Sequence, residues 1–285
     1  MTETAAEHDR TEGHASTARD TAIAYGRGAV GGLLIALPLL LTMEMWWAGF
    51  TVSAPRLLGL VAVNFGVLLV LQHYSGLHPD KTAGSQFRAA LVAYGMGIAI
   101  SAITLEMINV LRGGVALVDV VGKLVLEAVP VSIGASLAMS HFGVEHQEVE
   151  RRKDEDNFWG ERAMALAGSM IFGVSVASTE EMTMIGLQLH WGHSLALVVV
   201  SIVQVHAILF AVRRGKGEDS RRPGALRSLV EEGVGVYAVA LVVSAYLLWT
   251  FGQIGGETGL LAAADIVITL AFSTSLGAAA AELLL

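Results

Sequence analysis

A threonine followed two positions later by a glutamate, and then by a methionine, occurs three times in this sequence, at residues 42–45, 104–107 and 179–182. Carboxylate and hydroxyl oxygens are the ligands that hard cations prefer, and a carboxyl group can also hold a proton. Each motif lies inside a long apolar segment, where a charged side chain costs at least ~2.5–3.5 kcal/mol to insert into a membrane. The candidate residues in the three motifs are Thr42, Glu44, Thr104, Glu106, Thr179, Glu180 and Glu181.

The three glutamates Glu44, Glu106 and Glu181 are predicted to lie at one depth. Each follows an arginine at the start of its apolar segment by 17 to 19 residues, which corresponds to roughly 25–28 Å of helix. A fourth segment carries Tyr246 at the equivalent position, so that copy lacks the acid. We interpret the three acids as an outer site that attracts or coordinates a cation or holds a proton. The alternative is that protonated glutamates only hydrogen-bond neighbouring helices.

A second polar group recurs at helical spacing. Asp119, Lys123 and Glu127 are four residues apart and therefore share one helix face, which predicts a salt-bridged stripe. Lys123 could be a tethered cation that a permeating ion displaces, or part of a proton relay. It could equally neutralise two buried acids so that the helix inserts. Asp265 falls near the position of Lys123 when the two halves of the chain are aligned, and it is a further candidate.

The composition indicates what must position these residues. The chain has 285 residues, of which 54% are hydrophobic and only 15% are charged, whereas soluble domains contain about 25% charged residues. The sequence therefore predicts a polytopic membrane protein. The absence of cysteine excludes a disulfide scaffold and thiolate sites. With a net charge of −8, nucleic acid is not an expected partner. We expect no cofactor, and the sequence leaves metal binding open.

Eight apolar runs have about the ~20 residues that a spanning helix requires. They lie at about 28–50, 54–73, 86–111, 115–141, 162–188, 191–212, 226–251 and 258–283. A membrane barrel would show short alternating segments instead, so we predict an all-α fold with eight transmembrane helices. Residues 1–25 are polar and typical of a disordered tail. Residues 142–161 are highly charged and predict a cytoplasmic linker between two four-helix halves, 26–141 and 162–285.

The Lys and Arg residues predict the orientation. Nearly all of them lie in or beside the tail, the linker and the loops on the same side, whereas only Arg56 and Arg112 lie on the opposite side. By the positive-inside rule, both termini are expected in the cytoplasm.

The two halves also share a sequence pattern. Residues 42–63 align without gaps to 179–200, and 129–138 resemble 272–281. Because each half has an even number of spans, the halves would enter the membrane from the same side as a parallel repeat. Small residues at helical spacing, such as Ala93, Gly97 and Ser101, are typical of close helix contacts.

The segments TMEMWW and STEEMTM, in an eight-helix arrangement, resemble a family of bacterial integral membrane proteins of unknown function. The resemblance would cover residues 26–285. It implies a protein of the bacterial cytoplasmic membrane and transfers no activity or site residue.

We therefore expect a cation channel or transporter, for a proton or for a monovalent or divalent ion, that uses intramembrane carboxylates and contacts the lipid bilayer. Ions would pass inward by Glu127. One alternative is an intramembrane enzyme acting on a lipid or prenyl substrate, which the absence of a nucleophile–base pair disfavours. The other is a non-catalytic membrane assembly subunit. Self-association into a homo-oligomer stays open.

Overall fold

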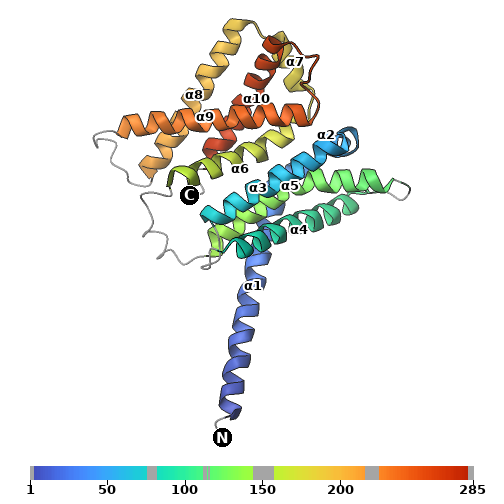
Figure 1. Ribbon diagram of the computed structural model, residues 1–285, viewed down its shortest axis with the longest axis vertical. Helices are drawn as coiled ribbons and strands as arrows, with labels where there is room; N and C mark the ends of the chain where they lie inside the picture. Colours follow the sequence, from blue (N-terminus) through green and yellow to red (C-terminus); the bar gives the residue numbers. More distant parts are fainter. Residues whose placement is uncertain are drawn as a thin grey trace.

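The computed structural model describes residues 3–75, 82–111, 114, 116–143, 157–215 and 225–281, and every regular element in these ranges is an α-helix. The helices of the first half are α1 (Glu3–Leu40), α2 (Met43–Thr51), α3 (Ala54–Ser75), α4 (Ala83–Met107) and α5 (Leu117–Gly143). Those of the second half are α6 (Asn157–Ala177), α7 (Glu181–Gln188), α8 (Trp191–Gly215), α9 (Ala225–Thr250) and α10 (Leu260–Ala281). Figure 1 shows α1, α3, α4 and α5 in the lower part of the molecule and α7 to α10 in the upper part, with α2 and α6 between them.

Seven of the described helices are long and apolar enough to cross a membrane, and an eighth span results if α6 and α7 are taken as one broken span. The all-α polytopic fold is therefore confirmed, but two of the predicted segments are not continuous. The segment 162–188 bends by 88° between α6 and α7. The segment 28–50 breaks between Leu40 and Met43. Hydropathy alone could not predict these breaks, because the segments on both sides of each break are apolar on average.

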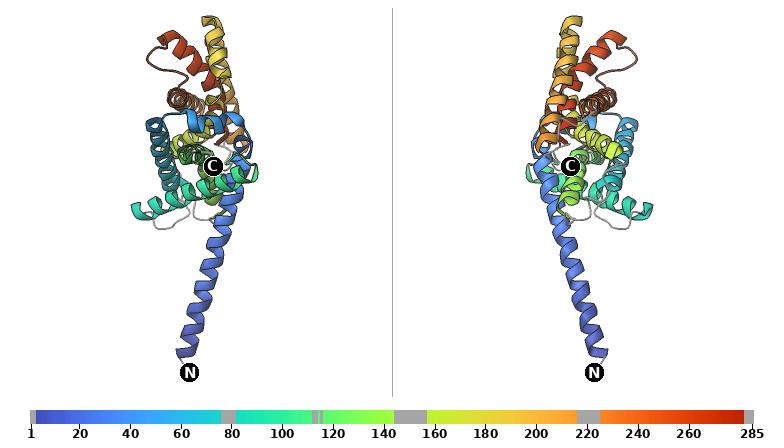
Figure 2. Two further views of the ribbon diagram at one scale, coloured as in Figure 1. Left: turned by 90° about the vertical axis from the view of Figure 1, so that its right-hand side faces the viewer. Right: turned by 90° about the vertical axis from the view of Figure 1, so that its left-hand side faces the viewer.

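The long helix α1 extends away from the rest of the molecule and carries the N-terminus at its far end (Figures 1 and 2). It begins at Glu3, so the structure has helix where the polar composition of residues 1–25 predicted disorder. A tail that continues an existing transmembrane helix needs no new helix nucleus. Its alanines, glutamates and arginines are also good helix formers. The predicted linker 142–161 lies largely outside the described residues.

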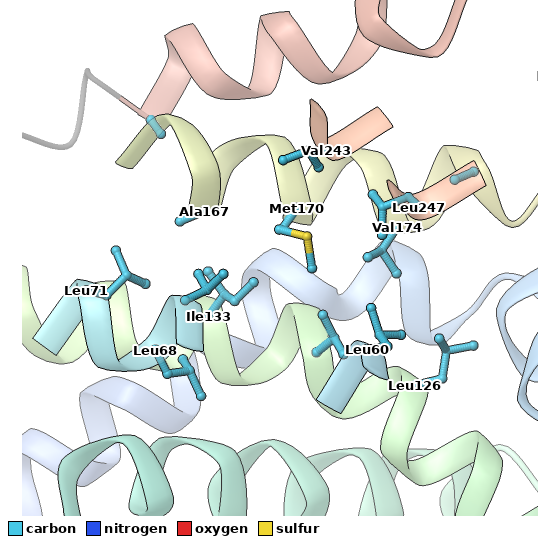
Figure 3. Packing of buried hydrophobic residues seen from close by; sticks show 14 of the residues in the cluster. Leu60, Leu68, Leu71, Leu126, Ile133, Ala167, Met170, Val174, Val243 and Leu247 are labelled. Atoms are coloured by element: carbon cyan, nitrogen blue, oxygen red, sulfur yellow. The ribbon is translucent and has the colours of Figure 1, made fainter. Parts of the chain in front are cut away.

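One central helix organises each half. In the first half, α5 packs against α1, α2, α3 and α4; in the second, α10 packs against α6, α7, α8 and α9. The halves meet where α3 and α5 contact α6 and where α3 contacts α9. Buried side chains from both halves form one apolar cluster at this junction, which includes Leu60, Leu68, Ile133, Met170 and Leu247 (Figure 3). The parallel repeat itself stays a prediction.

Candidate functional site

Two of the three threonine–glutamate motifs lie at the breaks in the helices. At the first break, the backbone N–H and the hydroxyl of Thr42 both donate to the carbonyl of Leu39, at 2.9 and 2.7 Å. At the second, Thr179 donates to the carbonyl of Val176 in the same way, at 3.2 and 2.9 Å. Each threonine therefore hydrogen-bonds a carbonyl group at the end of one helix, and a short new helix begins just after it.

The glutamates of these two motifs open the short helices. Glu44 lies in the first turn of α2 and Glu181 in the first turn of α7, where a negative charge interacts favourably with the helix dipole. Both side chains are exposed, as is Glu180. In these two places the motif therefore has a local structural role, since its threonine ends one helix and its glutamate lies in the first turn of the next. The sequence pattern did not predict this role.

The third motif lies in a different local structure. Glu106 belongs to the last turn of α4, where the N–H of Ile108 donates to the carbonyl of Thr104 and Asn109 adopts a positive φ of 62°. Glu106 is exposed. The part of the chain that the structure describes has no group of three or more His, Asp or Glu side chains placed to hold a metal ion. The meeting of Glu44, Glu106 and Glu181 in one site stays a prediction.

Glu127 is the acid with the most unusual surroundings. It lies in the middle of α5, its exposed fraction is 0%, and neither carboxylate oxygen has a hydrogen-bond partner among the described residues. Burying an ionised carboxylate without a partner is very costly. Glu127 therefore needs a proton, or a cation that takes the proton's place.

The salt bridge predicted for the stripe on α5 is not formed. The ammonium of Lys123 lies over the ring of Phe50, with Nζ 5.7 Å from the ring centroid, and the carboxylate of Glu127 has no partner. The side chain of Lys123 is nearly buried, with 9% exposed. Asp119 is half-buried in the first turn of α5. Because α2 folds over α5, the aromatic ring of Phe50 lies beside Lys123. Helical spacing within α5 could not predict this contact.

The residues one turn before and one turn after Glu127 contact α2 and α1, which join at the first helix break. A Cβ added to Gly49 of α2 would lie 2.6 Å from the Cα of Lys123, one turn before Glu127. One added to Gly32 of α1 would lie 2.8 Å from the carbonyl oxygen of Val131, one turn after it. Residues four apart share a helix face, so Glu127 lies between these two contacts.

The side chains that α1 brings to this region are apolar. Ala36 and Leu40, which lie between Gly32 and the break, are both buried. The pair formed by Asn64 and Ser132, with the amide donating to the hydroxyl at 3.0 Å, belongs to another face of α5. Ser132 is five residues beyond Glu127, which is about 140° around the helix.

Other predicted site residues lie elsewhere. Asp265 accepts a 2.6 Å hydrogen bond from the hydroxyl of Ser194, which joins α10 to α8. The hydroxyl of Tyr246 lies 3.9 Å from the Cβ position of Gly59 and so belongs to the contact between α9 and α3. Neither residue is on the helices that surround Glu127.

Sequence reasoning also missed two polar contacts. Gln72 donates to the hydroxyl of Ser136 at 2.9 Å, and Arg213 pairs with Glu232. Glu232 of α9 is buried although it is not among the candidate residues. The helical spacing of Ser132 and Ser136 on one face of α5 was the available signal for the first contact.

Comparison with known proteins agrees with the membrane fold and assigns no activity to the chain. No curated protein and no solved structure matches the chain. One family profile matches residues 24–285, which is nearly the whole chain. This confirms the resemblance to an integral membrane family of unknown function: the chain belongs to the family described as "Putative integral membrane protein (DUF2391)".

Proposed function

We propose that this protein transports a cation across the bacterial cytoplasmic membrane, with both termini in the cytoplasm, and that Glu127 is the carboxyl through which the cation passes. The observation that carries the proposal is the complete burial of this side chain with both oxygens unpartnered. Ionisable residues inside membrane spans are expensive, and most of them serve ion or proton pathways. A helix break beside the acid fits this role, because transporter sites commonly form at discontinuous helices.

The proposed parallel repeat supplies an internal comparison. A shift of 137 residues relates the end of α1 to the end of α6 and the start of α3 to that of α8. A shift of 143 relates the ends of α4 and α9 and the starts of α5 and α10. Equal boundaries at two constant shifts support a duplication with a six-residue difference in one loop.

The close helix contacts follow the same two shifts. Gly31 of α1 meets Ala138 of α5, and its counterpart Gly168 of α6 meets Ala281 of α10. Gly49 of α2 packs against the backbone of Lys123, and its counterpart Gly186 of α7 packs against that of Ile266. A Cβ added to either glycine would lie 2.6 Å from the Cα of the facing residue. These pairs support the equivalence of Lys123 with Ile266.

By the same shift, Glu127 corresponds to Leu270, which is fully buried in the apolar cluster. The second half thus has isoleucine and leucine, Ile266 and Leu270, at the two positions equivalent to Lys123 and Glu127. Packing alone does not require a lysine and a glutamate there, which favours a functional reason for Glu127 over a structural one.

The exposed acids have a supporting part in this proposal. Glu44, Glu106, Glu180 and Glu181 are all exposed at the helix ends assigned to the outer side. A surface of one charge raises the local concentration of the opposite ions. We therefore assign these acids to attracting cations, with Glu127 as the site inside the membrane.

The test is a flux measurement with purified protein in liposomes that contain indicators for protons, monovalent cations or divalent cations. We expect the parent protein to move at least one of these ions faster than empty liposomes, and Glu127→Leu to abolish that movement. Glu106→Gln is the matched control, because it removes an exposed acid, and it should keep at least half of the rate. Equal flux from Glu127→Leu and the parent would make Glu127 a packing residue.

A further inference from the structure

We infer that the cation carried by Glu127 is a proton, and that the ammonium of Lys123 becomes the counter-charge of the carboxylate once the proton has left. The inference rests on the proposed function and names its substrate. It starts from three observations: the carboxyl without partners, the apolar surface opposite it, and a lysine held one turn away by an aromatic ring.

The surroundings of Glu127 suit a proton better than a metal cation. Calcium takes six to eight oxygen ligands, and magnesium requires an octahedral set. Neither oxygen of this carboxyl has a hydrogen-bond partner among the described residues, and α1 presents Ala36 and Leu40 in this region. The described residues also hold no group of three or more His, Asp or Glu side chains that could bind a metal ion. The unpartnered amide oxygen of Asn64 belongs to the face that carries Ser132. A proton needs only the carboxyl oxygen itself.

Lys123 is positioned to replace the proton's charge. Residues four apart on a helix have Cβ atoms about 5–6 Å apart, so the flexible side chain of Lys123 reaches Glu127. While Glu127 is neutral, the ammonium has no partner on α5, and the ring of Phe50 holds it by a cation–π contact. Once Glu127 is ionised, the attraction between full charges in a buried site exceeds that contact.

Other charged groups on the helices that contact α5 are less suited to act as the counter-charge of the Glu127 carboxylate. Glu44 of α2 and Glu106 of α4 are exposed, and Arg56 of α3 lies over the ring of Trp249 at 5.4 Å. Asp119 is eight residues from Glu127 on α5. Among the residues whose side chains the structure describes, the remaining titratable or charged groups on or beside helices that touch α5 are Arg19, Arg27 and Tyr25 on α1, His73 and Tyr74 on α3, Arg88 and Tyr94 on α4, and Glu161, Arg162 and Glu180 at or beside α6.

The step conserves atoms and charge. The O–H bond of the Glu127 carboxyl breaks, and the proton passes to water on one side of the membrane. The ammonium of Lys123 keeps its three protons and moves from Phe50 to the carboxylate. The site changes from one positive charge to a neutral ion pair, and the released proton carries the positive charge away. Protonation from the other side reforms the O–H bond and returns the ammonium to Phe50. One proton crosses in each cycle.

The test combines infrared spectroscopy with flux. The parent protein in lipid should show the carbonyl band of a protonated carboxyl, and Glu127→Gln should lack it. Raising the pH should remove the band with a midpoint that moves up by at least one pH unit in Lys123→Met, because the positive charge that favours the ionised form is gone. Asp119→Asn and the charge-retaining Lys123→Arg are the controls, and their midpoints should stay close to that of the parent. Lys123→Gln replaces the Met variant should that one not insert.

The outcomes separate the two proposals. An unchanged midpoint in Lys123→Met overturns the role of the lysine. If Glu127→Leu abolishes flux of sodium or another metal cation, and that ion removes the infrared band at constant pH, the proton is wrong but Glu127 still carries a cation. If no flux depends on Glu127, the proposed function itself fails.

Discussion

Exchanging the side chains at positions 127 and 270 should separate a functional carboxyl from a packing one. Glu127 is completely buried and has two oxygens without partners. An unsatisfied buried polar group costs about 1–3 kcal/mol, and leucine has nearly the same size and no polar atom. We therefore expect Glu127→Leu to raise the free energy of unfolding by about 1–3 kcal/mol while it abolishes transport.

The reciprocal change should have the opposite effect on stability. Leu270 is fully buried in the apolar cluster between the halves. A carboxyl placed there has neither a partner nor water, so Leu270→Glu should lower the free energy of unfolding by about 2–3 kcal/mol or more. The assay is thermal unfolding of both purified variants and the parent in one detergent, followed by intrinsic fluorescence. A lower melting temperature for Glu127→Leu than for the parent would mean that the carboxyl makes a stabilising hydrogen bond, and the reasoning would be refuted.

Three further predictions concern the fold around the site. Gly49→Val should destabilise the protein by about 1–3 kcal/mol because its Cβ would lie 2.6 Å from the backbone of Lys123; Gly66→Ala, with nothing within 4 Å, should be neutral or slightly stabilising in the same melting assay. Thr42→Val removes the hydroxyl bond to the carbonyl of Leu39 but keeps the backbone bond, and it should cost about 0.5–1.5 kcal/mol; an unchanged melting temperature would mean that the hydroxyl does not stabilise the break. A reporter that is active only in the periplasm, fused to the C-terminus, should give no signal, whereas a strong signal would overturn the cytoplasmic orientation.

The helices themselves could be predicted because a membrane imposes a simple rule. Every span needs about 20 apolar residues, and the predicted runs correspond to the helices that the structure has. The breaks could not be predicted in this way, since 41–42 and 178–180 interrupt runs that remain apolar on average. At each break, the backbone N–H and the hydroxyl of Thr42 or Thr179 both donate to the carbonyl three residues earlier, a local pattern that average hydropathy does not show.

The surroundings of Lys123 and Glu127 were predicted only in part, because a sequence shows spacing along one helix and not contacts between helices. Spacing identified Lys123 and Glu127 as neighbours on one face, and the structure places them so, but spacing cannot say whether neighbours bond. The partner of Lys123 is Phe50, which comes near only because α2 folds back over α5. The three motifs look equivalent in the sequence, but two of them lie at the start of a short helix and the one at Glu106 lies at the end of a long one.

Charge movement on a solid-supported membrane measures directly whether a cation passes through Glu127. Proteoliposomes that contain equal amounts of the parent, Glu127→Leu or Glu106→Gln would be exposed to a rapid jump in proton or cation concentration, and the transient current would be recorded. We expect a current from the parent and from Glu106→Gln, and none above empty liposomes from Glu127→Leu. A current from Glu127→Leu equal to that of the parent would contradict the assignment of Glu127 as the carboxyl through which the cation passes.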